Sequence, residues 1–379
     1  MDVYQASLEL HKKHGGKLET ISKVPLNNKE DLSLAYTPGV AEVCREIARD
    51  KSLVFSHTLK GNTIAVISDG SAILGLGNLG PEAALPVMEG KCALFKSFAN
   101  VDAFPICLDT QDTEEIIKTI KYLAPVFGGI NLEDISAPRC FEIENRLKKE
   151  LDIPVMHDDQ HGTATVVLAA LINALKLRKS EDEKMVKIVV NGAGAAGLAI
   201  VDLLLKYGFK DIIICDSKGA IYSGREDLNE EKKRFANLTN LEERKGLLGE
   251  VIKERDIFIG VSAPGVLNAE MIKSMNKEAI IFALANPVPE IMPDEAKAAG
   301  AFVVATGRSD FPNQLNNVLA FPGIFRGALD NKIKQITDKM LIQAAINIAS
   351  LVTDLNPEMI LPNPFNKDIS IAVSQAIKD

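Results

Sequence analysis

The sequence predicts an α/β protein of two domains, an N-terminal α/β domain followed by a doubly wound, Rossmann-type domain. Short apolar runs alternate with longer helical segments in two series, which is typical of parallel sheets with helical crossovers. A glycine-rich turn joins a strand to a helix at the start of the second series. With 379 residues, the chain also exceeds what one core usually holds, which leaves room for a cleft between domains.

The predicted elements set the expected domain boundaries. Strands of the first series are predicted at 63–67, 103–108, 128–132 and 153–156. Strands of the second series are predicted at 187–191, 211–215, 257–261, 279–284 and 302–306. A helix is expected over 162–177, between the two series, and the end of the chain is mainly helical. Because such a terminal block often packs back on the first domain, we expect a discontinuous first domain, 1–157 plus 316–379, and a Rossmann-type domain at 158–315.

Composition and charge exclude several classes of partner. The chain is 46% hydrophobic and 25% charged, its net charge is −8, and it has no long block of Lys or Arg, so we expect no nucleic-acid partner. Residues 1–16 predict a polar amphipathic helix, and no apolar run reaches membrane-spanning length. We therefore expect a cytoplasmic location and no membrane association. The five cysteines lack CxxC spacing, which favours reduced thiols.

The strongest local motif is a glycine fingerprint that follows the strand predicted at 187–191. Its residues are Gly192, Ala193, Gly194, Ala195, Ala196 and Gly197. The first glycine permits a tight turn, the second lets the backbone approach a pyrophosphate, and the third allows close packing of helix and strand. The helix start then offers free N–H groups to the anion. The motif predicts an NAD(P)-binding domain, although a glycine-rich turn without a ligand is the alternative.

The choice of nucleotide depends on the next strand end. Asp216 follows Gly197 by 19 residues, and a carboxylate there accepts hydrogen bonds from the adenosine ribose and repels a 2′-phosphate. This predicts NAD in preference to NADP. Lys218 lies two residues further on and weakens that interpretation, so NADP stays open.

A second glycine motif is weaker evidence for a nucleotide. Gly75, Gly77 and Gly80 have the same spacing, but no acidic residue ends a following strand at the right interval. Pro81 suits the first turn of a helix. This loop either shapes the wall of the cleft or contacts the cofactor phosphates from the opposite side.

Two pairs of acidic residues follow predicted buried strands. They are Glu133-Asp134 and Asp158-Asp159. Crowded carboxylates repel one another unless a cation or a proton intervenes, which favours a divalent metal with oxygen ligands. The alternative is that each pair caps the next helix. His157 and His161 also have a spacing that can suit zinc on one helix face, but they straddle a predicted bend between strand and helix.

Two further residues are candidates for proton transfer. Lys91 lies on a largely apolar predicted helix, where burial and a nearby cation would lower its pKa from about 10.4 and make it a base. Lys96 is expected to reach solvent, as most helical lysines do. Tyr36 precedes Thr37-Pro38, which we interpret as a helix start. A tyrosine there has either a packing role or a chemical one.

Together these motifs resemble those of malic enzymes. The segments YTPGV at 36–40, ILGLGNLG, EGKCALFK, LEDI, HDDQHGTA and NGAGAAG occur in the order and approximate spacing of that family, over nearly the whole chain. The chain is most similar to the short bacterial or archaeal form. The resemblance implies oxidative decarboxylation of malate to pyruvate and CO2, with NAD or NADP and a divalent metal. The first domain would then be the substrate and catalytic domain.

The resemblance also implies individual roles. Glu133, Asp134 and Asp159 would bind the metal, Lys91 would be the general base, Tyr36 the general acid, and Asp158 the residue that orients Lys91. Asn286 and Asn317 would line the substrate and nicotinamide end of the cleft. Mg²⁺ or Mn²⁺ suits three carboxylates better than Zn²⁺ does. Larger malic enzymes carry an arginine where this chain has Ala72, so the substrate carboxylates must be held differently.

Two other functions fit parts of the pattern. An amino-acid dehydrogenase would share the layout, the fingerprint and a catalytic lysine, but it needs no metal. A nucleotide-sensing module would need only the fingerprint. Malic enzymes are commonly dimers or larger, so we expect a homo-oligomer, and we hypothesise that Tyr36 serves the cleft of a neighbouring subunit.

Overall fold

The computed structural model describes residues 2–178 and 184–378, and this part of the chain contains two mainly parallel sheets. The first sheet has the strand order β2-β1-β3-β4, and all its neighbours pair in parallel. Its strands are β1 (Thr63–Ser68), β2 (Asp102–Cys107), β3 (Gly129–Leu132) and β4 (Val155–His157). The four strands predicted for the first series are therefore confirmed to within two residues at each end.

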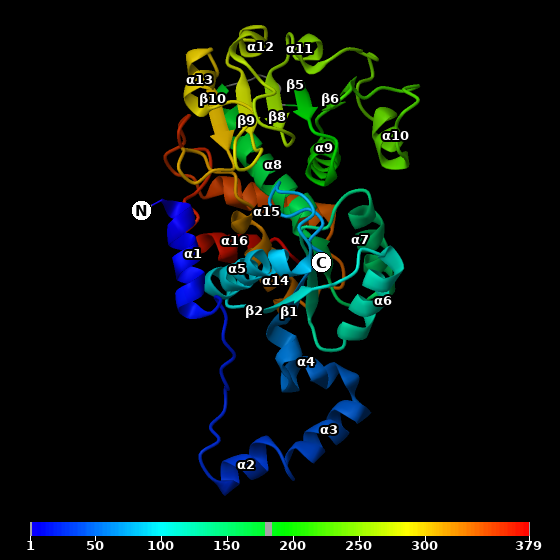
Figure 1. Ribbon diagram of the computed structural model, residues 1–379, viewed down its shortest axis with the longest axis vertical. Coiled ribbons are helices and arrows are strands. Elements are labelled where there is room, and N and C mark those ends of the chain that lie inside the picture. The colour runs from blue at the N-terminus through cyan, green and yellow to red at the C-terminus, as the bar shows by residue number, and fades with distance from the viewer. Residues whose placement is uncertain (1, 179–183, 379) are drawn as a thin grey trace.

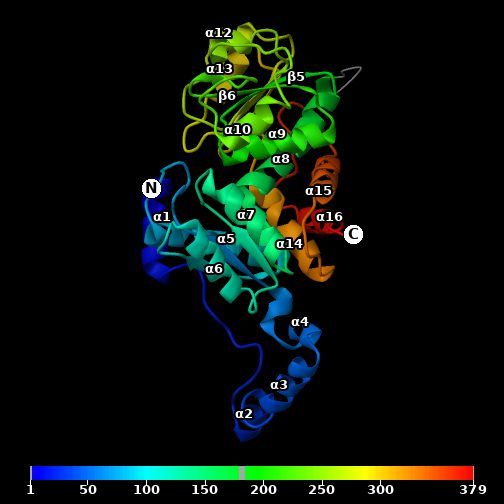
Figure 2. The same cartoon turned by 90° about the vertical axis from the view of Figure 1, so that its right-hand side faces the viewer.

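Helices cover the first sheet (Figure 2). They are α5 (Pro81–Ala99), α6 (Thr113–Leu123) and α7 (Arg139–Glu150). Helix α5 contacts β1 and β2, and α6 contacts α7. Pro81 occupies the first turn of α5 as predicted, where a missing N–H costs no hydrogen bond.

The second sheet has the order β10-β9-β8-β5-β6-β7 and is parallel except for β7. Its strands are β5 (Lys187–Asn191), β6 (Asp211–Asp216), β7 (Gly219–Ala220), β8 (Ile257–Gly260), β9 (Ile280–Ala283) and β10 (Val303–Thr306). Its helices are α9 (Ala195–Tyr207), α10 (Glu230–Ala236), α11 (Leu248–Val251), α12 (Ala269–Lys273) and α13 (Pro293–Ala298). The chain turns from β6 back to β8 on the other side of β5, so the carboxyl ends of β5 and β8 form the switch point where such sheets bind ligands.

Helix α8 (Asp158–Arg178) connects the two sheets. It contacts α9 beside the second sheet and α15 from the end of the chain, and every residue from 164 to 175 is buried. The helix was predicted over 162–177 and begins four residues earlier. Although it is long, it belongs to the core, and no helix within 2–178 or 184–378 has the length and apolarity needed to cross a membrane.

The C-terminal helices return to the first sheet. They are α14 (Phe321–Asp330), α15 (Asp338–Ser350) and α16 (Asp368–Ser374), preceded by a 3₁₀ turn, η3 (Asn317–Leu319). Helix α14 contacts α5, β3 and α16. The rings of Phe321 and Phe325 meet Phe95 of α5 with centroids 4.7 and 5.6 Å apart. The aromatic contacts hold the end of the chain on the helix that carries Lys91.

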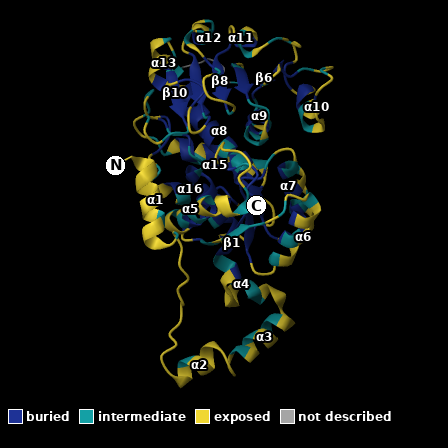
Figure 3. Ribbon diagram, viewed as in Figure 1, coloured by how far each residue is buried: buried dark blue, intermediate teal, exposed yellow. Residues whose placement is uncertain are grey.

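The N-terminal region contrasts with this packed body (Figures 1 and 3). It contains α1 (Val3–His14), α2 (Lys29–Ala35), α3 (Val40–Arg49) and α4 (Val54–His57), followed by a 3₁₀ turn, η2 (Leu59–Asn62). None of the four α-helices has a buried residue. Residues 18–57, here called the N-terminal arm, carry α2 and α3 away from both sheets (Figure 1).

Candidate active site

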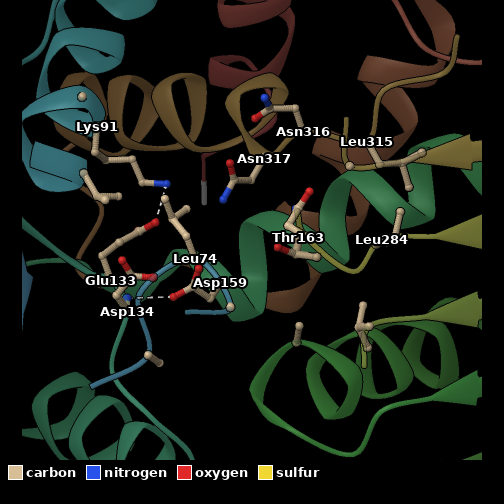
Figure 4. Close-up of a pocket in the computed structure, with 18 of the residues that line it drawn as sticks. Leu74, Lys91, Glu133, Asp134, Asp159, Thr163, Leu284, Leu315, Asn316 and Asn317 are labelled. Atoms are coloured by element: carbon tan, nitrogen blue, oxygen red, sulfur yellow. Dashed lines mark hydrogen bonds and ion pairs between the residues drawn. The ribbon is translucent and has the colours of Figure 1, made fainter. Parts of the chain in front are cut away.

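A cavity of about 760 Å³ lies between the two sheets and is lined by seven of the fifteen predicted site residues (Figure 4). One end is formed by Lys91, Glu133, Asp134 and Asp159, and the other by Ala196, Val261, Ser262 and Leu284. Ala72, Gly75, Asn286 and Asn317 lie in the wall. The cavity therefore runs from the acidic pairs to the start of the glycine-fingerprint helix.

The first acidic pair continues directly from β3. The Glu133 amide donates to the Ile67 carbonyl of β1 over 2.9 Å, and one Glu133 carboxylate oxygen accepts from Asn131 Nδ2 over 3.0 Å. Asp134 has a positive φ of 52°, which turns the chain out of the sheet. The alternative that this pair caps the next helix is wrong, because α7 begins at Arg139 with Pro138 at its N-cap.

The second pair forms the first two residues of α8, and it meets the first pair. The Asp134 amide donates to Asp159 Oδ2 over 2.9 Å (Figure 4). Gly162 leaves the space that Asp158 occupies, because a Cβ on Gly162 would lie 1.8 Å from Asp158 Oδ1. The two acidic pairs are thus gathered at one end of the cavity.

Lys91 points from α5 into this acidic cluster and does not reach for solvent. Its side chain is only 7% exposed, and its Nζ lies 2.8 Å from Glu133 Oε1 and 2.5 Å from Asp158 Oδ2. The amine also lies 4.1 Å from the centre of the Phe321 ring. Asn317 Nδ2 donates to the same Asp158 oxygen over 2.5 Å. In contrast, Lys96 is exposed and pairs with Asp102 at the surface.

The cluster holds more negative than positive charge. Four carboxyl groups surround one amine, and three of the four are buried. Burial raises the pKa of Asp134 to about 8, with the charges of Asp159 and Glu133 adding to it, and burial raises the pKa of Asp158 to about 7. The pKa values of Glu133 and Asp159 are also raised, because burial disfavours their charged forms.

The same cluster acts on Lys91. Burial alone lowers the pKa of this lysine, but the neighbouring carboxylates, Asp158 first, outweigh burial and raise it above its ordinary value. In this arrangement the lysine is the counter-cation of the cluster. A neutral Lys91 needs another positive charge to take over that role.

The donor set fits a hard divalent cation. Asp134 Oδ2 and Asp158 Oδ1 are buried without a hydrogen-bond partner, and the cluster offers several carboxylate oxygens, which Mg²⁺ and Mn²⁺ prefer as ligands. In the described part of the chain, no group of three or more His, Cys, Asp or Glu side chains is already arranged to hold a metal ion. The carboxylates are assembled around Lys91, so metal binding requires their side chains to turn towards the ion.

The two histidines do not form a helical zinc pair. His157 is the last residue of β4, and His161 lies in α8, as the predicted bend implied. Burial lowers the pKa of His157 and keeps its ring neutral. His161 Nε2 instead lies 3.0 Å from an oxygen of Glu144, which also accepts from the His157 amide over 3.0 Å. Glu144, which sequence reasoning missed, thus braces the turn that carries the second acidic pair.

The glycine fingerprint has the geometry predicted for it. Gly192 has a φ of +124°, and a Cβ on Gly197 would lie 1.7 Å from the Gly192 carbonyl oxygen. A Cβ on Gly194 would meet nothing within 4 Å, so the backbone is open to a ligand there. Helix α9 begins at Ala195, with its free N–H groups at this turn.

Asp216 ends β6 beside the fingerprint, but its carboxylate is not free. Arg225 Nη2 donates to both Asp216 oxygens, over 2.9 and 3.0 Å, and Lys232 Nζ donates to Oδ2 over 2.7 Å. Although burial raises the pKa of Asp216, these hydrogen bonds outweigh burial and lower it. Lys218, which we expected beside Asp216, directs its amine to Asp227 instead.

The second glycine loop forms part of the cavity wall. A Cβ on Gly75 would lie 2.7 Å from the Asn286 carbonyl oxygen, so this loop packs against the Asn286 segment of the other domain. Ala72 lies in the same wall. Of the two interpretations of this motif, the structure favours a loop that shapes the cleft.

Tyr36 is not brought to the cavity within one chain. It lies at the end of α2 in the N-terminal arm, where its residue is 67% exposed, and it does not line the cavity. Figure 1 shows α2 far from α5. The predicted helix start at Thr37-Pro38 is wrong by two residues, because α3 begins at Val40 after Gly39.

Sequence reasoning missed several other wall residues. Ser7, His11 and Lys17 line the cavity from the N-terminal segment, and Thr163 and Asn316 line it from α8 and from the residue before η3. Lys17 Nζ donates to the Pro86 carbonyl over 2.6 Å. Nothing in its local sequence distinguishes Lys17 from a surface lysine, because only the fold places α1 beside α5.

Comparisons with known proteins agree on one family. The family model described as "Malic enzyme, N-terminal domain" matches residues 15–148, and "Malic enzyme, NAD binding domain" matches 160–379. The chain is 58% identical to a bifunctional malic/malolactic enzyme of Bacillus subtilis, over all of the chain and 92% of that protein. It is 47% identical to an NADP-dependent malic enzyme of Rhizobium meliloti, over 98% of the chain and 51% of that protein. The crystal structure of an NAD-dependent malic enzyme from Thermotoga maritima matches with a TM-score of 0.95 and 51% identity, over 100% of this chain and 99% of that one.

Proposed function

Because the chain belongs to the malic enzyme family, we propose that it catalyses the oxidative decarboxylation of L-malate to pyruvate and CO2, with reduction of NAD or NADP and a divalent metal. One observation supports this beyond family membership: the cavity connects a lysine in a crowded carboxylate cluster to a dinucleotide fingerprint. An amino-acid dehydrogenase or a nucleotide-sensing module would leave that cluster without a purpose.

Lys91 is the proposed general base. Loss of a hydride from C2 of malate to the nicotinamide is accompanied by loss of the C2 hydroxyl proton, and Lys91 is the amine that faces this end of the cavity (Figure 4). Asp158 Oδ2 accepts hydrogen bonds from both Lys91 Nζ and Asn317 Nδ2, and these contacts fix the direction of the lysine amine. General base catalysis of this kind contributes roughly 10²–10⁴-fold.

Glu133, Asp134 and Asp159 are the proposed metal ligands. A bound Mg²⁺ or Mn²⁺ would act as a Lewis acid on the substrate oxygens. Its ligands would then no longer need Lys91 as their counter-cation, which is the condition for a neutral amine. One orphaned carboxylate oxygen on a proposed ligand supports this assignment, Asp134 Oδ2.

The substrate carboxylates require donors other than an arginine at position 72. Asn286 and Asn317 offer amide groups in the cavity wall, and Lys17 offers a positive charge on the same wall. These residues are the proposed substrate contacts at the nicotinamide end. Asn317 Nδ2 already donates one hydrogen bond to Asp158, so its second N–H is the donor left for a substrate carboxylate.

Tyr36 is the proposed general acid that protonates C3 after CO2 has left, and it serves the cavity of a second subunit. Support comes from the N-terminal arm, which has no core of its own. Large apolar side chains are exposed along it, at Ile21, Val24, Leu26, Leu32, Leu34 and Tyr36. An apolar segment of this length is expected to be covered, and a second copy of the chain would cover it while completing the site. A homodimer or larger homo-oligomer is therefore part of the proposal.

The proposed domain division remains 1–157 plus 316–379 and 158–315. It is supported by the contacts of α14 with α5 and β3, although the family model for the NAD-binding domain extends over the end of the chain. A cytoplasmic location and the lack of a nucleic-acid or membrane partner remain predictions from composition.

The reaction is tested by following NAD and NADP reduction with L-malate, with and without Mn²⁺. We expect reduction only when malate and metal are both present, with pyruvate formed in equal amount. Reduction that is independent of metal, or absent with both nucleotides, contradicts the proposal.

The shared site is tested by mixing Tyr36→Phe and Lys91→Ala chains. In hybrid dimers one cavity regains both residues, so part of the activity should return. A chain with both substitutions, mixed with either single variant, is the matched control and should restore nothing. No recovery after proven subunit exchange would place Tyr36 and Lys91 in the same chain's site.

A further inference from the structure

Asp216, whose carboxylate is expected to bind the adenosine ribose, is surrounded by cationic side chains. Asp216 lies at the carboxyl end of β6, and the Gly192 amide donates to the carbonyl of neighbouring Cys215 over 2.9 Å. This places Asp216 beside the glycine turn, where the ribose of a bound dinucleotide lies in Rossmann domains. The groups around Asp216 therefore determine whether this position binds a 2′-hydroxyl or a 2′-phosphate more tightly.

The acceptor capacity of Asp216 is already used. Each carboxylate oxygen accepts one bond from Arg225 Nη2, and Oδ1 accepts a second from the Lys218 amide over 3.0 Å. Oδ2 accepts its second bond from Lys232 Nζ over 2.7 Å. A carboxylate has about four lone-pair positions, so a ribose hydroxyl gains a bond to Asp216 only by displacing one of these donors.

The two cations on Asp216 differ in availability. Arg225 is 8% exposed, and its remaining N–H groups donate to Asp227 and to the carbonyls of Gly219 and Ala220. It has no donor left for a ligand. Lys232 is the third residue of α10, its side chain is 23% exposed, and only one of its three N–H bonds is directed at Asp216.

The local charge is positive despite the aspartate. Three cationic side chains, Lys218, Arg225 and Lys232, face two carboxylates, Asp216 and Asp227. A lone aspartate at this position would repel a 2′-phosphate. Here the surplus charge lies on Lys218 and Lys232, whose ammonium groups are both accessible.

We propose that Lys232, assisted by Lys218, binds the 2′-phosphate of NADP, so that this chain accepts NADP at least as well as NAD. The proposal rests on the proposed function for its physiological meaning, but the nucleotide contact itself does not depend on malate. It replaces the preference for NAD that Asp216 alone predicts. Arg225 is a positioning residue, because it neutralises the Asp216 carboxylate and has no N–H group left to contact the nucleotide.

The direct test compares two adenosine probes that bind without substrate or metal. Adenosine 2′,5′-bisphosphate carries the 2′-phosphate, and 5′-AMP lacks it. By titration calorimetry, the wild-type chain should bind the bisphosphate at least as tightly as AMP. Lys232→Gln should weaken the bisphosphate about tenfold, the cost of losing a charge-assisted hydrogen bond, and change AMP by less than about twofold. Lys232→Arg should keep most of the affinity for the bisphosphate.

A matched control lies one residue away. Lys233 occupies the same helix but pairs with Glu230, so Lys233→Gln should leave both probes unchanged. If the wild-type chain prefers AMP by more than about tenfold, or if Lys232→Gln weakens both probes equally, the proposal is overturned. The second result would mean that Lys232 only anchors α10.

Kinetics extend the test to the whole reaction. The ratio of kcat/KM for NADP to that for NAD should fall about tenfold in Lys232→Gln and stay constant in Lys233→Gln. If malate supports reduction of neither nucleotide while the probes still discriminate, the proposed function fails and the nucleotide contact stands. Unchanged ratios with active enzyme overturn the nucleotide contact alone.

Discussion

Two regions of this protein carry acidic residues at the carboxyl ends of parallel strands but give them opposite surroundings. At the ends of β3 and β4, four carboxyl groups share one amine, Lys91. At the end of β6, Asp216 lies where the ribose is expected, and it forms ion pairs with Arg225 and Lys232. The first arrangement has a deficit of positive charge and suits a cation, whereas the second has a surplus and suits an anion. The position of an acid in the fold therefore does not determine its ligand, because neighbouring charges do.

The largest expected effect is at the acidic cluster. Lys91→Ala removes the proposed base, so kcat for malate oxidation should fall roughly 10²–10⁴-fold. Binding of 5′-AMP at the other end of the cavity should stay the same, as calorimetry would show. Lys96→Ala, on the exposed side of the same helix, is the control and should keep its activity. Near-normal turnover of Lys91→Ala contradicts the base assignment.

The next effect concerns the metal. Asp159→Asn removes a proposed ligand, so the Mn²⁺ concentration for half-maximal activity should rise by at least the 10–100-fold typical of losing even an outer-shell partner. Asp152→Asn changes an exposed acid that pairs with Lys334 and serves as the control. An unchanged Mn²⁺ requirement in Asp159→Asn would remove this residue from the metal site.

A smaller effect is expected at the other strand end. Asp216→Asn leaves Arg225 and Lys232 without their counter-charge, so the ratio of kcat/KM for NADP to that for NAD should rise by up to about tenfold. Glu226→Gln, an exposed neighbour, should leave the ratio unchanged. A fall in the ratio would show that Asp216 does not compete with the 2′-phosphate for the charge of Lys232.

The smallest effect is on stability as a function of pH. Asp134 has a pKa of about 8 in the folded protein and about 3.9 when unfolded. Between these values the folded state binds more protons, so without metal the free energy of unfolding should fall as pH rises from about 4 to 8. Thermal melts of the wild-type chain from pH 6 to 8.5 should show a Tm that declines with pH. The decline should be smaller in Asp134→Asn, and Mn²⁺ should restore the Tm of the wild-type chain at high pH. A metal-free Tm that rises over this range contradicts the charge deficit.

The sequence predicted the two sheets well because buried parallel strands are short, continuous apolar runs. It missed β7, whose two residues carry no hydrophobic pattern. It placed the acidic pairs and Lys91 correctly at one end of the cleft, since strand ends of one sheet must meet at one edge. It did not predict that Arg225 and Lys232 hold Asp216, because they lie 9 and 16 residues beyond it, in a loop and on α10, and only the fold brings them back.

The N-terminal arm shows another limit of sequence reasoning. Local sequence patterns can predict helices near the N-terminus, as they did for α1, but they do not show which surface the helices of the arm pack against. Tyr36 was assigned to the site by resemblance, whereas the structure of one chain leaves it exposed on α2. The sequence of one chain does not show whether a residue serves the site of its own subunit or that of a second copy.

The most direct test of the cation-binding cluster is anomalous diffraction from crystals of the full chain soaked in Mn²⁺. We expect one strong peak among Glu133, Asp134 and Asp159, with the Lys91 amine moved away from Glu133. A peak elsewhere, or no peak while Lys91 keeps both of its carboxylate contacts, would contradict it.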